Sequence, residues 1–156
     1  MIVFRLCKSA WKNDLSGHGA EITGGRWNSK GIPVVYTSSS RALCMVEIAV
    51  HTPLGCLPTD FFMVEIGIPD NLQIIEVFED ELPQNWQSFG FKQITQAIGD
   101  GFIKEKKALV LKVPSAVVQG DFNYLINPGH KDIGSISIIK TRAFGFDERL
   151  FGKIIT

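Results

Sequence analysis

Segments typical of β-strands outnumber segments typical of helices, and the two kinds do not alternate along the chain. Short runs rich in β-branched and aromatic residues predict strands at 2–6, 32–37, 61–68, 73–77, 108–113 and 135–142. Helices are expected at 41–51, between an N-capping serine and Pro53, and at 91–98 with an extension to 106. A helical turn is expected at 147–151. Without regular strand–helix alternation, the pattern favours an α+β fold with a mixed or antiparallel sheet and a few helices.

A single compact domain, residues 1–156, accounts for the whole chain. The sequence is 45% hydrophobic and 21% charged, both near the average for globular proteins. A domain of this length buries enough surface to fold without disulfides or a structural metal. The cysteines are odd in number and form no CxxC pair, which argues against a disulfide scaffold or a zinc ribbon, and Cys44 is expected to be a small buried apolar residue. No metal site is expected, because the three histidines lack ligand spacing: His18, His51 and His130.

The charge balance restricts the classes of partner. Sixteen lysines and arginines offset sixteen aspartates and glutamates. The composition therefore lacks the excess of basic residues that most nucleic-acid-binding proteins carry. No apolar run approaches 18 residues, and the first residues do not read as a secretory leader. We therefore expect a cytoplasmic protein that binds neither nucleic acid directly nor a membrane.

Residues 12–31 read as a long glycine-rich loop, because five of the fifteen glycines fall between positions 17 and 31. Within it, Arg26 lies between a pair of glycines and Trp27. One interpretation is an ordinary turn with a core tryptophan. The other is an anion clamp, because a guanidinium binds phosphate through two parallel hydrogen bonds. The loop matches neither the dinucleotide-binding glycine pattern nor the Walker pattern.

Glu47 is the only acid in the apolar helix expected at 41–51, and it shares one stripe of that helix with Cys44 and His51. Two hypotheses have equal weight. The stripe faces solvent and carries a Glu47–His51 pair, or it holds a carboxylate at the floor of a cleft, where partners or a ligand offset burial.

Three further polar residues have an ordinary and a functional interpretation. Tyr36 is a core tyrosine or a ring that stacks on a planar ligand. Ser115, after Pro114, reads as a turn or capping residue, with no Ser-His-Asp order that would make it a nucleophile. Asn127 lies in a turn and could also fix a loop around a ligand.

Taken in order, these positions resemble the RES-domain family. The resemblance runs from Phe4 to Leu150 through the segments at 4–5, 24–28, 33–38, 47–51, 113–115, 123–130 and 146–150. The family is named for an arginine, a glutamate and a serine, which Arg26, Glu47 and Ser115 match here. The chain is short for the family.

The resemblance implies the toxin of a bacterial RES–Xre toxin–antitoxin pair, with a fold similar to ADP-ribosyltransferases. Such an enzyme takes NAD⁺ as a substrate rather than a cofactor, and hydrolyses or phosphorolyses the nicotinamide–ribose bond. The resemblance also implies a cognate Xre-like antitoxin as partner and antitoxin-bound assemblies. A homo-oligomer is one of the possible states, because the sequence leaves the oligomeric state open. Alternatives are a mono-ADP-ribosyltransferase acting on a protein, and a catalytically inactive nucleotide- or partner-binding module.

The resemblance also assigns roles to individual residues. Glu47 would stabilise positive charge on the ribose, and Arg5 and Arg26 would bind the pyrophosphate or the adjoining ribose. Tyr36 would pack against nicotinamide, and Ser115 would orient the ribose or the carboxamide. Asn127 would contribute to NAD⁺ binding.

Overall fold

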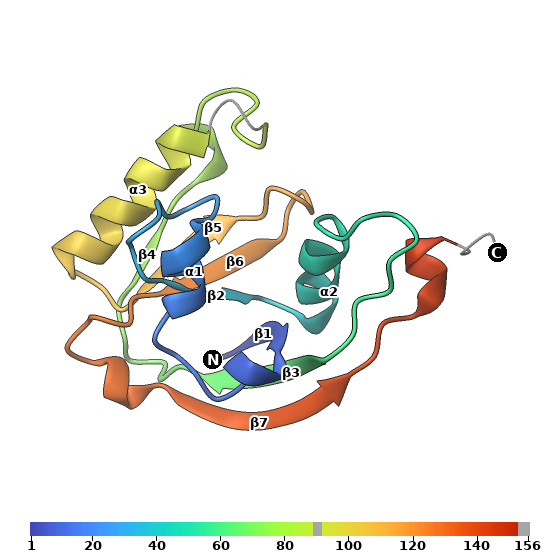
Figure 1. The fold of residues 1–156 in the computed structure, drawn as a ribbon. Helices are drawn as coiled ribbons and strands as arrows, with labels where there is room; N and C mark the ends of the chain where they lie inside the picture. The colour runs from blue at the N-terminus through green and yellow to red at the C-terminus, as the bar shows by residue number, and fades with distance from the viewer. Residues whose placement is uncertain (89–91, 153–156) are drawn as a thin grey trace.

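The computed structural model describes residues 1–88 and 92–152, which form one seven-stranded mixed sheet with helices against it (Figure 1). The strand order is β4-β5-β6-β2-β1-β3-β7. Only β4 and β5 pair in parallel, and all the other neighbours are antiparallel. The α+β class and the mixed sheet expected from the sequence are confirmed.

The strands are short, and most are bounded by turns. Their bounds are β1 Ile2–Lys8, β2 Val35–Ser38, β3 Phe61–Gly67, β4 Ile74–Glu76, β5 Val110–Pro114, β6 Phe122–Ile126 and β7 Ser137–Phe144. The helices are α1 His18–Thr23, α2 Arg41–Ala49 and α3 Lys92–Glu105, with 3-10 turns at Ser9–Trp11, Glu79–Glu81, Ile133–Ser135 and Glu148–Phe151. No helix in the described ranges is long and apolar enough to cross a membrane.

Two helices lie against different parts of the sheet. Residues of α3 pack with Leu111 of β5 and Leu125 of β6, whereas Cys44 of α2 packs with Leu6 of β1 and Met63 of β3. The other face of β5 contributes Val110 to a separate apolar cluster. Strand β5 is thus buried on both sides, and α2 and α3 stand apart (Figure 1).

Three elements differ from the sequence prediction. The segment 12–31 is not a continuous loop, because α1 forms within it, and the strand expected from residue 32 begins at Val35. Strand β6 was not predicted at all, although it pairs with both β2 and β5. Phe122, Tyr124 and Ile126 carry the expected propensity for a strand, but Asn123 interrupts the apolar run.

The remaining predicted elements are observed with shifted ends. The two helical stretches expected at 91–98 and up to 106 form the single helix α3, and position 91 lies outside the described residues. Helix α2 ends at Ala49, two residues before the predicted end. Cys44 is buried as expected, and the three cysteines are free thiols.

Candidate active site

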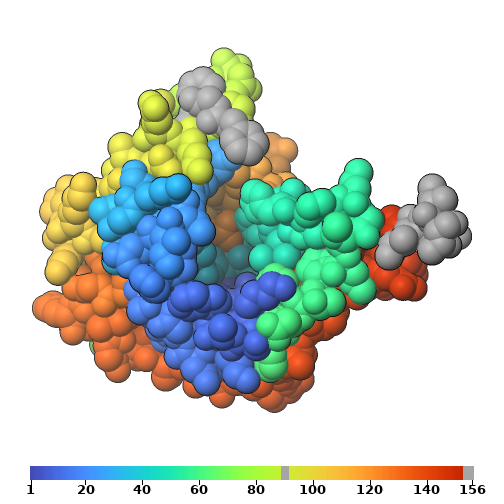
Figure 2. All heavy atoms as spheres, viewed as in Figure 1, coloured from blue at the N-terminus to red at the C-terminus, as the bar shows by residue number. Residues whose placement is uncertain are grey.

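A cleft of about 930 Å³ opens where β1 and β2 separate. These strands share a single paired position, Phe4 with Ser38, whereas β1 and β3 pair along seven positions. Residues from β1, β2, α2 and the segment 17–27 line the cleft, and Figure 2 shows it as a hollow at the centre of one face. Its size lies at the upper end of the range for small-molecule sites.

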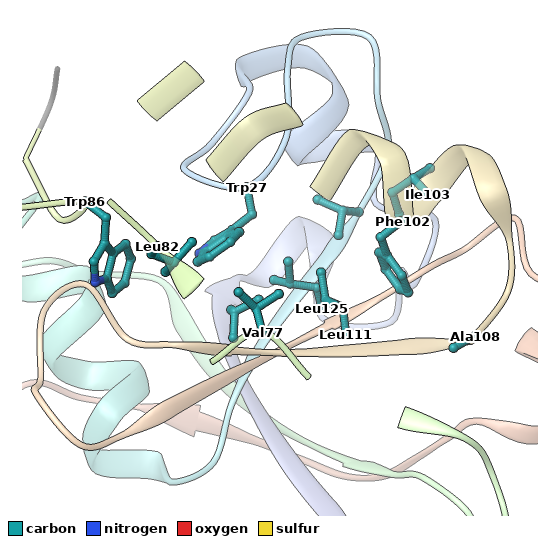
Figure 3. Packing of buried hydrophobic residues seen from close by; sticks show 11 residues of the cluster. Trp27, Val77, Leu82, Trp86, Phe102, Ile103, Ala108, Leu111 and Leu125 are labelled. Atoms are coloured by element: carbon teal, nitrogen blue, oxygen red, sulfur yellow. The ribbon is translucent and has the colours of Figure 1, made fainter. Parts of the chain in front are cut away.

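The wall at 24–28 is anchored from below by Trp27. The Trp27 side chain is 3% exposed and packs near Trp86, with ring centroids 5.8 Å apart and the rings tilted (Figure 3). Leu111 and Leu125 of the sheet belong to the same apolar cluster. Burial of a tryptophan in this cluster fixes the position of residues 24–28 relative to the sheet.

Helix α3 holds the same wall from the side. The Thr95 hydroxyl donates to the Arg26 carbonyl at 2.6 Å, and the Gln96 amide donates to the Gly25 carbonyl at 2.8 Å. The backbone N–H of Ser29 donates to the Asp100 carboxylate at 2.9 Å. Carbonyls of a loop that would otherwise need water are therefore satisfied by one face of α3.

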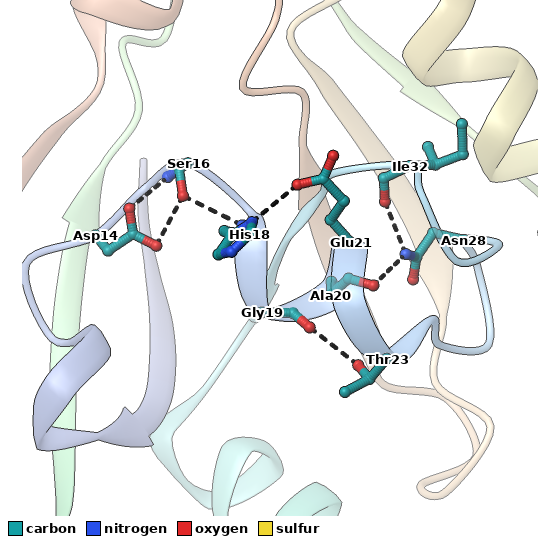
Figure 4. A network of polar contacts seen from close by, with 9 residues as sticks. All are labelled: Asp14, Ser16, His18, Gly19, Ala20, Glu21, Thr23, Asn28 and Ile32. Carbon is teal, nitrogen blue, oxygen red and sulfur yellow. Dashed lines mark hydrogen bonds and ion pairs between the residues drawn. The ribbon is translucent and has the colours of Figure 1, made fainter.

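The Asn28 side chain cross-links this loop through hydrogen bonds. Its side chain is fully buried and donates to the carbonyls of Ala20 and Ile32, both at 2.8 Å (Figure 4). The Ala20 carbonyl belongs to α1, whose His18 pairs with Glu21. Asn28 therefore connects α1 to the chain leading into β2.

Arg26 lies at the cleft wall, partly buried. Its guanidinium donates to the carbonyls of Trp86 at 3.1 Å and Gln87 at 2.7 Å, and its centre lies 6.0 Å from the Trp86 ring centroid. Burial lowers the pKa of Arg26, and the negative charge of Glu47 opposes that shift. The two backbone contacts hold the cation in one orientation and leave its remaining N–H groups for other acceptors.

Tyr36 points its hydroxyl at the same wall. The hydroxyl donates to Asn28 Oδ1 at 2.8 Å and accepts from the Trp27 backbone N–H at 3.0 Å. Burial raises the pKa of Tyr36. Because Tyr36 also lines the cleft, its ring is available to a ligand while its hydroxyl is occupied within the protein.

Glu47 lies on the opposite side of the cleft. Ser40 caps α2 by accepting from the Leu43 N–H at 3.1 Å, as the serine run predicted. The stripe Cys44, Glu47 and His51 lines the cleft, and its first residue is 5% exposed. The hypothesis of a carboxylate facing a cleft therefore describes α2 better than a solvent-facing stripe.

Two neutral donors hold one oxygen of that carboxylate. The Ser115 hydroxyl donates to Glu47 Oε1 at 3.1 Å, and the Asn123 amide donates to the same atom at 2.8 Å. Asn123 also lines the cleft. Sequence reasoning missed Asn123 because its strand, β6, was missed.

The other predicted residues have different positions. Arg5 lines the cleft and donates to the carbonyls of Asp14 and, at 3.5 Å, Trp11. Ser115 is 4% exposed and lies outside the cleft lining, behind Glu47. Its hydroxyl contacts the Glu47 carboxylate.

Asn127 lies away from the cleft, and its predicted role in binding NAD⁺ does not fit this position. It follows the end of β6 opposite to Asn123 and is fully buried. Its amide donates to the Ile103 carbonyl at 3.0 Å, and its Oδ1 accepts from the Gly129 N–H at 2.9 Å. The alternative considered from sequence, a turn-forming asparagine, describes it.

The charged side chains lining the cleft are mostly cationic. Arg5, Arg26 and Lys92 are cations, and Glu47 is the one carboxylate among the lining residues of the described chain. No group of histidine, cysteine, aspartate and glutamate in residues 1–88 and 92–152 is arranged to hold a metal ion. The site therefore suits an anionic organic ligand that presents a positively charged centre to Glu47.

Comparison with known proteins identifies the family. The chain is 40% identical over 143 residues to a protein of Sphingobium sp. (strain YBL2) named "Prs ADP-ribosylating toxin", covering 90% of this chain and 89% of that one. It is 37% identical over 153 residues to "Toxin Res" of Photorhabdus laumondii subsp. laumondii, covering 96% and 97%.

A solved structure shares the fold. A chain in the crystal structure of the M. tuberculosis MbcT–MbcA toxin–antitoxin complex superposes with a TM-score of 0.72 at 21% identity, covering 92% of this chain and 84% of that one. The family model described as "RES domain" matches residues 2–147. The resemblance seen in the sequence is confirmed, and the chain belongs to the RES domain family.

Proposed function

We propose that this protein is the toxin of a toxin–antitoxin pair and cleaves the nicotinamide–ribose bond of NAD⁺. The observation that carries the proposal is the placement of Glu47, a single carboxylate fixed through Oε1 at a cleft whose other charged lining groups are cations. Cleavage of an N-glycosidic bond develops positive charge on the ribose, which a nearby carboxylate stabilises.

The residues that line the cleft have different roles in the proposed reaction. Arg5, Arg26 and Lys92 bind the pyrophosphate, because guanidinium and ammonium groups in one cleft complement its negative charges. The Tyr36 ring packs against nicotinamide. Glu47 stabilises the positively charged ribose.

The reaction needs no strong general acid and no cofactor. The C–N bond breaks with its electron pair moving to the pyridinium nitrogen, so nicotinamide leaves as a neutral molecule. Water or inorganic phosphate then supplies the electron pair for the new bond at the ribose carbon and loses a proton. Arg26 and Tyr36 act by binding, and Ser115 acts by holding Glu47.

A partner protein follows from the relatives. Two of them are named toxins, and the structural neighbour is part of a toxin–antitoxin complex. We propose a cognate Xre-like antitoxin that keeps this enzyme inactive in the cytoplasm, where depletion of NAD⁺ arrests growth. A helical Xre-like protein encoded beside this one would support the pair.

The test is incubation of the purified protein with NAD⁺, with and without inorganic phosphate, followed by chromatography of nicotinamide and ADP-ribose products. Wild type is expected to release nicotinamide, and the product in the presence of phosphate identifies the acceptor. Glu47→Gln and Arg26→Ala are expected to lose most of the rate yet remain folded. Glu105→Gln on the exposed end of α3 and Arg142→Ala on β7 are the matched controls. Intact NAD⁺ under every condition would overturn NAD⁺ degradation and leave two alternatives, a protein ADP-ribosyltransferase and a catalytically inactive binding module.

A second candidate is transfer of ADP-ribose to a protein. The name of the Sphingobium relative, an ADP-ribosylating toxin, favours it. Incubation with NAD⁺ labelled in the adenylate half and a bacterial extract separates the two. A labelled protein band that depends on Glu47 supports transfer, and free ADP-ribose without such a band supports hydrolysis.

A further inference from the structure

Asn123 is tied to Glu47 and to β2 at the same time. Its Nδ2 donates to Glu47 Oε1 at 2.8 Å, and its Oδ1 accepts from the Ser38 hydroxyl at 2.7 Å. Ser38, the donor of this second bond, is 5% exposed. Both functional ends of the Asn123 amide are therefore occupied.

The position of Ser38 follows from the sheet. Ser38 and Asn123 are directly opposed in the antiparallel pair of β2 and β6, where facing side chains lie on the same side. A hydroxyl that donates to the oxygen of the amide turns its nitrogen the other way, toward α2. Register in the sheet thus sets which end of Asn123 meets the carboxylate.

Glu47 receives its bonds on one oxygen only. Within the described ranges, Ser115 and Asn123 both donate to Oε1, and no hydrogen bond reaches Oε2. A carboxylate held through Oε1 alone leaves Oε2 available to accept another hydrogen bond.

We infer that Asn123, oriented by Ser38, is a positioning residue that fixes the Glu47 side chain with its free oxygen available to the ribose. This inference rests on the proposed function, since the ribose belongs to the proposed substrate. Both donors need an acceptor, so the two bonds together fix the orientation of the Glu47 side chain.

The chemistry of an amide matters here more than its size. An aspartate at position 123 has nearly the same shape but would put a second carboxylate against Glu47, and two such groups share a proton. The other titratable or charged groups around Glu47 come from several elements: Arg5, Arg26, Tyr36, Cys44, His51 and Lys92. The substitution Asn123→Asp leaves all of these residues in place. A new pH dependence of this variant would therefore come from the carboxylate pair at positions 47 and 123.

The first test is the pH profile of nicotinamide release by Asn123→Asp. The acid limb of kcat is expected to move up by at least about one pH unit relative to wild type, as for two carboxylates at one site. The matched control is Asn71→Asp, which makes the same change at an exposed turn between β3 and β4 and leaves the profile unchanged. An unchanged acid limb in Asn123→Asp would overturn the inference.

The second test separates positioning from binding. Asn123→Ala is expected to lower kcat roughly 10- to 100-fold, which is the size of the effect when a hydrogen-bonding partner of a metal-ligating side chain is removed. KM is expected to change less than about threefold. Ser38→Ala leaves the amide in place but free to rotate, and a smaller loss of kcat is expected. A loss confined to KM, or full kcat in both variants, would contradict the inference.

A third readout needs no turnover. The carboxyl carbon of Glu47, followed by NMR with labelled glutamate and assigned through Glu47→Gln, is expected to titrate at higher pH in Asn123→Asp than in wild type. If wild type leaves NAD⁺ intact but this shift is seen, the proposed function fails and the positioning of Glu47 stands. If wild type is active and the shift is absent, the opposite holds.

Discussion

The Ser115 hydroxyl donates to the Glu47 carboxylate at 3.1 Å, although 68 positions separate the two residues in the sequence. The same hydroxyl oxygen accepts from the backbone N–H groups of Val117 at 3.1 Å and Val118 at 3.0 Å. Ser115 thus joins the turn after β5 to the carboxylate on α2.

Replacing Ser115 by alanine is expected to cost both stability and turnover. Two partly buried N–H groups lose their acceptor, which lowers the free energy of unfolding by about 1–3 kcal/mol. Glu47 loses one of its two donors, so kcat for nicotinamide release falls while Asn123 still holds the carboxylate. Urea unfolding and steady-state kinetics measure the two effects. Ser135→Ala, at an exposed 3-10 turn, is the control, and equal behaviour of the two variants would refute the assignment.

Gly25→Ala is expected to damage the cleft wall. A methyl group at this position would lie 2.6 Å from the Tyr36 hydroxyl and 2.8 Å from Asn28 Oδ1, the two atoms of one hydrogen bond. Displacing them moves the ring of Tyr36, and a shift of about 1 Å at a reacting centre can cost roughly 100-fold in rate. Gly145→Ala, with no atom near the added methyl group, is the control. Kinetics of NAD⁺ cleavage equal to wild type would contradict this view of the wall.

Two glycines in α3 are expected to respond in opposite directions. At Gly99 an added methyl carbon would lie 1.7 Å from the Trp27 carbonyl oxygen, so α3 must move away from the loop. We expect Gly99→Ala to lower the free energy of unfolding by about 3 kcal/mol or more. Gly101→Ala meets no atom and is expected to stabilise the helix by about 1 kcal/mol. Thermal and urea unfolding of the two variants decide this, and a stable Gly99→Ala would show that the close approach is unimportant.

Tyr36 is expected to make stability fall at high pH. Burial raises the pKa of its hydroxyl in the folded state, whereas an unfolded tyrosine ionises near pH 10. Above about pH 10 the unfolded chain therefore loses a proton that the folded chain keeps, and the free energy of unfolding decreases as pH rises.

Urea unfolding between pH 8 and pH 11 checks this expectation against Tyr36→Phe. The variant lacks the ionising group, so the advantage of wild type over it should stay constant up to about pH 10 and then shrink by about 1.4 kcal/mol for each pH unit above the unfolded pKa. Parallel stability curves for the two proteins would rule out a buried, protonated hydroxyl.

The sequence predicted those site residues that stand out from their immediate neighbours in the chain. Glu47 is an acid in an apolar helix, Ser40 begins that helix, and Arg26 lies in a glycine-rich segment beside an anchoring tryptophan. Each of these signals lies within a few residues of the position that it marks. The resemblance to a family then joined these signals into one site.

Long-range pairing is what the sequence did not reveal. Asn123 matters because Ser38 opposes it in the sheet, a register between strands 85 positions apart. Missing β6 therefore meant missing Asn123. Ser115 and Asn127 have the residue types of a binding site, but sequence alone could not distinguish a side chain that faces a cleft from one that faces a neighbouring turn.

The place of β6 has a consequence for how the protein is made. This strand lies between β5 and β2, and it carries the amide that holds Glu47, yet it is among the last strands to leave the ribosome. A growing chain that has not reached residue 122 holds Arg5, Arg26, Tyr36 and Glu47 without the strand that joins β5 to β2. The order of synthesis itself therefore delays assembly of the cleft until β6 has been made.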